Sequence, residues 1–270
     1  MLNSLLESFA QNELVISWND PERARIRTSL STLRSRAKSY FSGDFIGIET
    51  FGSWNRNTIL PRRYDPSSDV DVMLVFHRDK YSNGASESAR NRVRIFASNS
   101  YSTSEVHLDT PCVKLELGHI KFDLVPAIQQ EWLPGYMIPD GRNRWMSTDP
   151  DLLEDKLTSV NQQVGNNLAR RIIRLCKYWN KAKENSALSS YFLESAVLDI
   201  LPYEPISWGM QRRTYDSFLY TIETLCSSFV QYSGSTTSSI IGSIRKARNN
   251  GLYQQQRTWI EHLLPGITTA

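Results

Sequence analysis

The first clear helical pattern of hydrophobic and polar positions begins at Asp20 and ends at Ser42-Gly43. Asp20 is a residue type that caps helix N-termini, and Pro21 takes the first helical position, where a missing N–H costs nothing. Apolar residues then recur every three or four positions, the spacing of one buried helix face. They are Ile26, Leu30, Leu33 and Ala37. The pattern therefore predicts a long helix.

The hydrophobic period then changes to one typical of β-strands. Residues 45–48 predict a short strand, and residues 70–76 predict a longer strand that is apolar at most positions, as buried strands are. A polar loop over residues 52–68 separates the two.

A further strand signal runs from Pro111 to Ala127, where apolar and polar residues alternate. Gly118-His119 interrupts the alternation, and a glycine in the first turn position is typical of a type II′ hairpin. In that register Glu116 faces Lys121, which is a favourable cross-strand pair.

From about residue 151 onward the pattern is helical. One helix combines an apolar stripe with a basic stripe about 140° around its axis. The apolar stripe is Val164, Leu168, Ile172, Leu175 and Trp179, and the basic one is Arg170, Arg174, Lys177 and Lys181. Further helices are predicted over 190–201, 215–231 and 252–264, and a flexible link over 233–239. The predicted fold class is α+β: a mixed sheet with a long N-terminal helix, followed by a helical bundle.

Composition excludes several classes of protein. The 270 residues are 40% hydrophobic and 22% charged, with 13 glycines and 11 prolines, which excludes a disordered or collagen-like chain. No apolar run approaches the roughly 20 residues of a membrane span, and the N-terminus lacks a basic segment typical of secretory signals. Three widely spaced cysteines argue against a disulfide framework and a zinc site. We therefore expect a soluble cytoplasmic protein.

The net charge of +3 is too small for a protein that coats nucleic acid. Basic residues nevertheless gather in two helical stretches, 21–40 and 169–183, and the second contains no acid. Such stretches suit a polyanionic small ligand or a short polynucleotide. A solvated helix face is an equally good interpretation of the first stretch.

Three aspartates lie where buried strands are predicted. Asp69 and Asp71 open one strand, and their spacing of two places both carboxylates on one face. Asp123 lies within the strand 120–125. Burying such charges is costly unless they are paired or hold a cation, and three convergent carboxylates suit Mg²⁺ or Mn²⁺. Taken singly, Asp69 could instead cap a turn and Asp123 could pair with Lys121 or an arginine.

Gly52-Ser53 follows the first predicted strand and precedes the acids by one loop. A glycine lets the backbone approach a phosphate closely, and a serine hydroxyl with backbone N–H groups binds phosphate oxygens. Neither signal is specific alone. The order strand, Gly-Ser, polar loop, Asp-x-Asp strand and third strand aspartate is specific in combination.

With this combination the sequence resembles the nucleotidyltransferase superfamily of the DNA polymerase β type. The resemblance implies that Asp69 and Asp71 hold two metal ions (Mg²⁺ or Mn²⁺) and that Asp123 completes the catalytic site. It further implies that Gly52 and Ser53 bind the triphosphate of the donor nucleotide. The chemistry is two-metal phosphoryl transfer, in which positioning and charge dominate.

Two helical phrases, RLCKYWNK over 174–181 and LSSYFLES over 188–195, are similar to those of the cGAS/DncV-like nucleotidyltransferases. The resemblance implies that Lys177 contacts the donor phosphates, and that Ser190 and Tyr191 bind phosphate and stack on a base. A tyrosine ring is a suitable platform for a nucleobase. The open alternatives are that Ser190 caps a helix, that Tyr191 packs in the core and that Lys177 lies on a solvated face.

The resemblance implies an enzyme that joins nucleoside triphosphates (ATP, GTP, UTP or CTP) into a cyclic oligonucleotide second messenger, in bacterial anti-phage (CBASS) signalling. It implies a nucleotidyltransferase core over residues 1–160 and, over 161–270, a helical domain of the poly(A)-polymerase and oligoadenylate-synthetase type. A regulatory protein and a downstream effector are the expected partners, whereas activation by long duplex DNA is not expected. The alternatives are nucleotide transfer to an RNA end, a protein or a small molecule, and a non-catalytic nucleotide-binding module.

Overall fold

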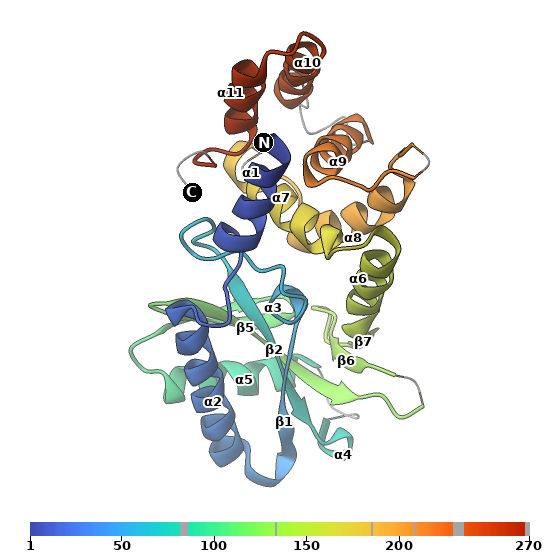
Figure 1. Ribbon diagram of the computed structural model, residues 1–270. Coiled ribbons are helices and arrows are strands. Elements are labelled where there is room, and N and C mark those ends of the chain that lie inside the picture. The colour runs from blue at the N-terminus through green and yellow to red at the C-terminus, as the bar shows by residue number, and fades with distance from the viewer. Residues whose placement is uncertain (82–85, 133, 185, 208, 229–234, 268–270) are drawn as a thin grey trace. The chain divides into compact units, whose positions relative to one another are not determined.

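The computed structural model describes residues 1–81, 86–132, 134–184, 186–207, 209–228 and 235–267. The chain divides into two compact units, whose elements are labelled in Figure 1. The sheet unit comprises Ile16–Arg62 and Pro66–Glu154, and the helical unit comprises Met1–Val15, Arg63–Asp65 and Asp155–Ala270. The mixed α+β fold is the one predicted, whereas the predicted domain division after residue 160 stays a prediction.

The sheet unit is built on a seven-stranded mixed sheet in which β1, β2, β5, β4 and β3 lie in that order. Strands β2 and β5 run parallel, and the other pairs are antiparallel. β6 pairs with the end of β5 on one side and with β7 on the other. The strands are β1 (Phe45–Phe51), β2 (Asp69–Phe76), β3 (Glu105–Asp109), β4 (Cys112–Leu117), β5 (Ile120–Gln129), β6 (Tyr136–Pro139) and β7 (Trp145–Thr148).

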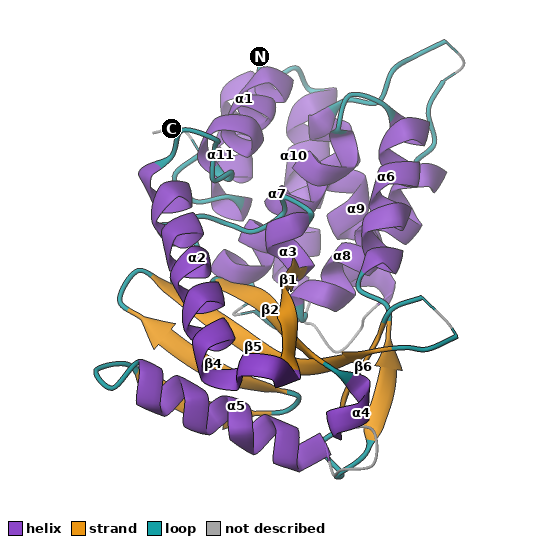
Figure 2. Cartoon of the chain, turned by 90° about the horizontal axis from the view of Figure 1, so that it is seen from below, coloured by secondary structure: helices purple, strands orange, loops and turns teal. Residues whose placement is uncertain are grey.

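Two helices cover one face of this sheet, α2 (Pro21–Phe41) and α5 (Ser86–Ser100), as Figure 2 shows. The short helices α3 (Gly52–Asn55) and α4 (Arg78–Tyr81) follow β1 and β2. The predicted cap of α2 is confirmed, because the Asp20 carboxylate accepts the backbone N–H of Glu22 at 2.8 Å. The main hydrophobic core lies between these helices and the sheet.

The helical unit contains most of the remaining helices. At the N-terminus α1 (Leu2–Ser8) leads into a π-helical segment over Phe9–Glu13. The later helices are α6 (Asp151–Val164, whose first residues belong to the sheet unit), α7 (Leu168–Lys183), α8 (Ser190–Ile200), α9 (Thr214–Ser228), α10 (Ser235–Asn249) and α11 (Tyr253–Leu263). A 3₁₀ turn over Leu201–Tyr203 follows α8.

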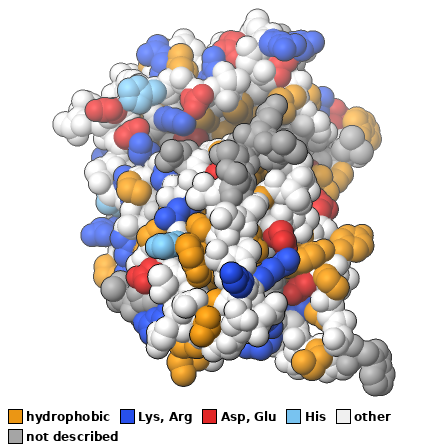
Figure 3. Space-filling model, turned by 90° about the horizontal axis from the view of Figure 1, so that it is seen from above, with side chains coloured by type: hydrophobic (Ala, Val, Ile, Leu, Met, Phe, Trp, Pro, Cys, Tyr) orange, Lys and Arg blue, Asp and Glu red, His pale blue; other side chains and the backbone are white. Residues whose placement is uncertain are grey.

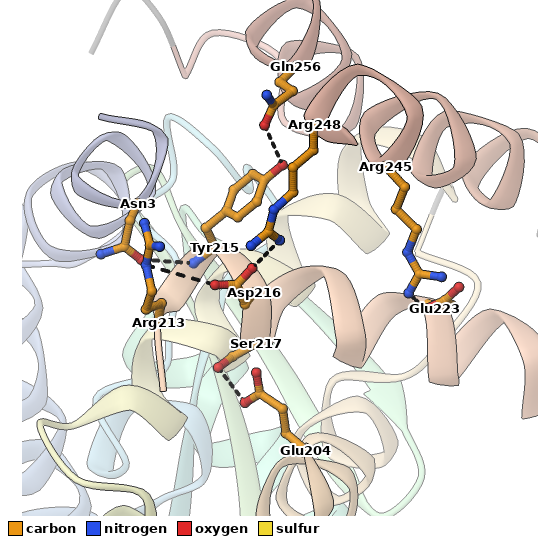
Figure 4. Close-up of polar contacts among 10 residues, drawn as sticks. All are labelled: Asn3, Glu204, Arg213, Tyr215, Asp216, Ser217, Glu223, Arg245, Arg248 and Gln256. Carbon is orange, nitrogen blue, oxygen red and sulfur yellow. Dashed lines mark hydrogen bonds and ion pairs between the residues drawn. The ribbon is translucent and has the colours of Figure 1, made fainter. Parts of the chain in front are cut away.

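Polar contacts tie α9 to the chain segments around it, as drawn in Figure 4. The backbone N–H of Tyr215 donates to the Asn3 side chain at 3.1 Å, which links α9 to α1. Arg248 of α10 donates to Asp216 of α9 at 2.6 Å. The first of these contacts joins the start of the chain to a helix that comes more than 200 residues later.

The helix α7 is buried on nearly all sides. Its sequence predicts a basic stripe about 140° from the apolar one, and almost the whole helix from Leu168 to Asn180 is buried. Arg171, Arg174 and Lys177 are only 6–8% exposed. The spacing on a helical wheel cannot reveal this, because it does not show how many neighbouring segments pack around a helix.

Two local predictions were wrong. The hairpin joining β4 to β5 has the predicted pairing of Glu116 with Lys121, but Gly118 does not adopt the positive φ that a type II′ turn requires. Residues 235–239, predicted as a flexible link, form the first turns of α10. Residues 229–234 lie outside the described residues. They include the end of the helix predicted over 215–231 and the start of the link predicted over 233–239.

Charge and hydrophobicity are mixed on the face drawn in Figure 3, where basic, acidic and apolar side chains are interspersed. Among the described residues, no helix is both long enough and apolar enough to cross a membrane. The three cysteines are free thiols in the structure.

Candidate active site

The parallel strands β2 and β5 bring the predicted aspartates onto one face of the sheet. Asp71 pairs in register with Asp123, and Asp69 lies two residues before Asp71. Residues paired across neighbouring strands point to the same face, and so do residues two apart on one strand. The intervening Val70 and Val72 are fully buried on the helix-covered face, as predicted.

Gly52 lies directly against Asp71. A Cβ atom at Gly52 would come 1.9 Å from Oδ2 of Asp71, and the backbone of Gly52 has a φ of +70°. Both the contact and the backbone conformation therefore require glycine. The Gly-Ser motif and the Asp-x-Asp motif, separated by a loop in the sequence, meet at this point.

Hydrogen bonds fix the short turn that carries Ser53. The backbone carbonyl of Ser53 accepts the N–H groups of Thr58 at 2.9 Å and Ile59 at 3.0 Å. The side chain of Asn55 donates to the carbonyl of Thr50 at 2.6 Å, across the end of β1. These bonds hold Ser53 in place while its side chain remains half-buried.

Asp123 has an unusual environment for a carboxylate. Its Oδ1 atom is buried and has no hydrogen-bond partner. Burial, and secondarily the charge of Asp69, raise the pKa of Asp123 to about 6, against the opposing effects of Lys114 and of the Cys112 thiol, which donates to this carboxylate. The alternative that Asp123 pairs with Lys121 is wrong, because Lys121 binds Glu116 at 2.9 Å.

The donor set at this face suits a hard divalent cation. Three carboxylates share the face, and one of their oxygens, Oδ1 of Asp123, is buried without a partner. Within the described residues, however, no three acidic, histidine or cysteine side chains already surround a single point as metal ligands would. Neighbouring strands lie about 5 Å apart, so the paired residues Asp71 and Asp123 lie side by side on this face.

The other predicted residues lie in the helical unit. Lys177 of α7 donates to Glu194 of α8 at 3.1 Å, and their side chains are only 8% and 1% exposed. The alternative of a solvated Lys177 is therefore wrong. Glu194 escaped the sequence analysis, although an acid four residues after Ser190 on an otherwise apolar helix face could have revealed it.

The structure also excludes the alternatives for the pair at the start of α8. The helix cap is Ser189, whose hydroxyl accepts the N–H of Phe192 at 3.3 Å, and not Ser190. Tyr191 does not pack in the core, since it is 69% exposed. Both predicted residues are exposed, one turn before the buried Glu194.

Comparison with known proteins identifies relatives of the chain. The sequence model of the Second Messenger Oligonucleotide or Dinucleotide Synthetase domain matches residues 1–161. A probable cyclic nucleotide synthase of Bacillus cereus (strain VD146) is 31% identical over 218 residues, which cover 68% of this chain and 63% of the relative. The chain thus spans slightly less than two thirds of this curated relative's length.

Two solved structures share the fold at low sequence identity. The CD-NTase CdnG of Bradyrhizobium diazoefficiens, determined with GTP, has a TM-score of 0.63 at 13% identity. The match covers 99% of this chain and 91% of the CdnG chain. Escherichia coli DncV, in a form with bound 3′-deoxy GTP, has a TM-score of 0.64 at 15% identity, with coverage of 100% and 82%.

Proposed function

The chain belongs to the family of Second Messenger Oligonucleotide or Dinucleotide Synthetase domains, and from this membership we propose that it is a metal-dependent nucleotidyltransferase that makes a cyclic oligonucleotide. The observation that carries the proposal is the face of the sheet where Asp69, Asp71 and Asp123 lie together. Gly52 lies against this face, as a Gly-Ser loop that binds a triphosphate should.

Asp69 and Asp71 would hold two ions, Mg²⁺ or Mn²⁺, and Asp123 would position the acceptor hydroxyl as a base or as a third ligand. Ions held there supply positive charge to the attacking hydroxyl and to the leaving pyrophosphate. Asp123 suits either role, because its buried Oδ1 atom has no hydrogen-bond partner and can accept a proton or bind an ion.

The residues that we propose to bind the donor triphosphate are Gly52, Ser53, Lys177 and Ser190. A lysine ammonium has three donors, and Glu194 accepts one of them, which leaves two for phosphate oxygens. The exposed ring of Tyr191 would stack on a nucleobase.

Substrates and partners are proposed from the relatives. A CdnE cyclic dinucleotide synthase has been determined with GTP, and a CdnC protein with ATP and in complex with a HORMA protein. We accordingly propose that nucleoside triphosphates are the substrates, that a regulatory protein controls the enzyme, and that the product acts on an effector in bacterial anti-phage signalling in the cytoplasm.

A product assay tests the proposal. The protein is incubated with Mg²⁺ or Mn²⁺ and all four triphosphates, with one of them labelled in turn, and the products are treated with phosphatase. A cyclic product keeps its label because it has no terminal phosphate, and mass spectrometry then identifies its bases and ring size. The double variant Asp69→Asn, Asp71→Asn should give no such product while remaining folded.

The matched control is Asp79→Asn, which removes a carboxylate from an exposed position of the same unit. It should retain full activity. Wild-type turnover by a folded double aspartate variant would overturn the assignment of the site. A linear product, or labelled RNA or protein when these are offered as acceptors, would replace the cyclase proposal by simple nucleotide transfer.

A further inference from the structure

Positive charge is concentrated at the N-terminal end of α7. Arg170, Arg171 and Arg174 lie within the first two turns, and the first turn contains no acid. The N-terminus of a helix is itself positive, so cations are unfavourable there. Burial, followed by the charges of Arg170 and Arg171, lowers the pKa of Arg174 to about 10. The arginines thus repel one another where the helix dipole already disfavours them.

A cavity of about 360 Å³ adjoins this end of α7. Its volume is at the lower end of the range for small-molecule sites. It lies wholly within the helical unit, between the end of α6, the start of α7 and the segment before α9. Its lining residues are Gln162, Gln163, Val164, Gly165, Asn166, Leu168, Arg171, Ile206, Met210, Gln211 and Arg212.

Two of the lining residues are arginines, and each has one donor, its Nε–H, that makes no hydrogen bond. Arg171 is 7% exposed, and its Nε–H has no hydrogen-bond partner, while its Nη2 lies 3.5 Å from Glu7. The Nε–H of Arg212 likewise has no hydrogen bond and lies 3.5 Å from the Glu204 carboxylate, whereas Nη2 of Arg212 donates to the carbonyls of Pro202 at 2.9 Å and Glu204 at 3.4 Å. A buried donor without an acceptor is unfavourable, so a ligand that accepts its hydrogen bond is stabilised.

The local charge balance is positive. Each cavity arginine has one carboxylate within 4 Å, Arg171 with Glu7 and Arg212 with Glu204. The excess positive charge comes from Arg170 and Arg174, which are neighbours of Arg171 on α7. Glu204 is moreover engaged by the hydroxyl of Ser217 at 2.6 Å, as Figure 4 shows. An excess of about two positive charges matches a phosphate monoester, which carries about −1.5 to −2 at neutral pH.

A second basic region of the same unit lacks these properties. Arg248 binds Asp216, which also lies 3.8 Å from Arg213, and Arg245 binds Glu223 (Figure 4). Unlike Arg171 and Arg212, neither Arg245 nor Arg248 has a buried donor without a hydrogen bond. The adjoining cavity is also smaller, at about 180 Å³. The comparison singles out the α7 end, where buried donors remain unused.

We propose that the cavity at the N-terminal end of α7 binds a small phosphorylated anion, with Arg171 and Arg212 donating to the phosphate oxygens. Guanidinium groups bind phosphate through paired donors, and the amides of Gln162, Gln163 and Gln211 add further donors around the same space. Free phosphate and a nucleoside monophosphate share this chemistry. The site uses none of the residues assigned to catalysis and stands independently of the proposed function.

Isothermal titration calorimetry tests the site, with inorganic phosphate and AMP as probes in EDTA-containing buffer without divalent metal. One molecule of probe should bind per chain. Equal affinities indicate that the site recognises free phosphate, and tighter binding of AMP indicates a nucleotide; both support the site. Arg171→Gln should weaken binding about ten-fold or more.

The exposed cavity residue Met210 supplies variants that spare the core, since it is 65% exposed. Met210→Glu should weaken binding of the anion, and Met210→Lys should strengthen it. If Arg171→Gln fails to fold, these two variants test the site in its place. Arg257→Gln, an arginine outside the cavity in α11, and the double variant Asp69→Asn, Asp71→Asn should bind as the wild type does. No binding at millimolar phosphate overturns the proposal. So do unchanged affinities in the cavity variants, or binding that is lost in the double aspartate variant.

Discussion

The sheet unit and the helical unit accommodate buried charge in opposite ways. In the sheet unit, carboxylates of like charge share one face, and the charge of Asp69 helps to raise the pKa of Asp123. In the helical unit, the most deeply buried lysine and glutamate form an opposite-charge pair, Lys177 with Glu194. The first arrangement gains stability when a cation or proton is added, and the second is already neutral.

This difference separates two kinds of contribution to an active site. Like charges held together by strand register make a place that attracts an ion, at a cost to stability. An opposite-charge pair holds one ammonium group in a fixed position without such a cost in repulsion. The same contrast recurs along α7, whose centre carries the neutral pair and whose N-terminal end carries the repelling arginines.

The largest effect is expected from breaking the neutral pair. Glu194→Gln leaves the buried Lys177 ammonium without its carboxylate, which should lower the free energy of unfolding by about 3 kcal/mol. The KM for nucleoside triphosphate should rise as well, because the lysine loses its fixed position. Urea denaturation and steady-state kinetics measure the two effects.

The control for Glu194 is the same substitution in an exposed ion pair. Glu223 of α9 binds Arg245 with both side chains more than a third exposed. Glu223→Gln should cost no more than about 1 kcal/mol, because exposed ion pairs contribute little. Equal costs for the two variants would contradict the idea that burial makes the Lys177 pair important.

The next largest effect is expected from Gly52→Ala, which should disrupt the acidic face, the face of the sheet that carries Asp69, Asp71 and Asp123. The new Cβ would displace the Asp71 carboxylate, and the positive φ of Gly52 would be strained, at a cost of about 1–3 kcal/mol. Turnover should fall about a hundred-fold or more, since small displacements of catalytic groups are costly. Gly43→Ala is the control, because a Cβ at Gly43 meets no atom within 4 Å. Similar activities of the two variants would show that Gly52 is not needed to place Asp71.

The acidic face should also give a distinct dependence of stability on pH. The folded pKa of Asp123 is about 6 and its ordinary value is 3.8, so the folded state binds the proton more tightly. The resulting stabilisation is fully present below about pH 4 and is lost as the pH rises through 6. Urea denaturation in EDTA between pH 4 and pH 7 should show this loss in the wild type and a smaller one in Asp123→Asn. Identical profiles would place the titration elsewhere.

The sequence predicted those parts of the molecule that depend on local pattern. The cap and length of α2 follow from Asp20, Pro21 and the apolar spacing. The shared face of Asp69 and Asp71 follows from the alternation along a strand. The approach of Gly52 to Asp71 was not predictable, because it depends on how the β1–α3 turn packs against β2.

Other parts were missed because long-range contacts override local preference. The serine- and threonine-rich start of α10 favours a loop by composition, yet Thr237 is buried and donates to Glu184 at 2.9 Å. Trp179 of α7 in turn donates to Thr237 at 3.4 Å. The burial of the α7 arginines has the same origin, since segments distant in sequence surround that helix.

The smallest effect is expected when one cation at each end of α7 is replaced by glutamine. Arg170 lies at the positive end of the helix dipole and adds to the repulsion on Arg174, so Arg170→Gln should raise the free energy of unfolding by a few tenths of a kcal/mol. Lys183 lies in the last turn, where a cation is favourable, so Lys183→Gln should lower it by about as much. Both differences should shrink in high salt, because screening weakens charge effects. If both substitutions change the free energy of unfolding in the same direction, repulsion among the arginines at the start of α7 does not destabilise the helix. The positive potential that we assign to the adjoining cavity would then lose its support.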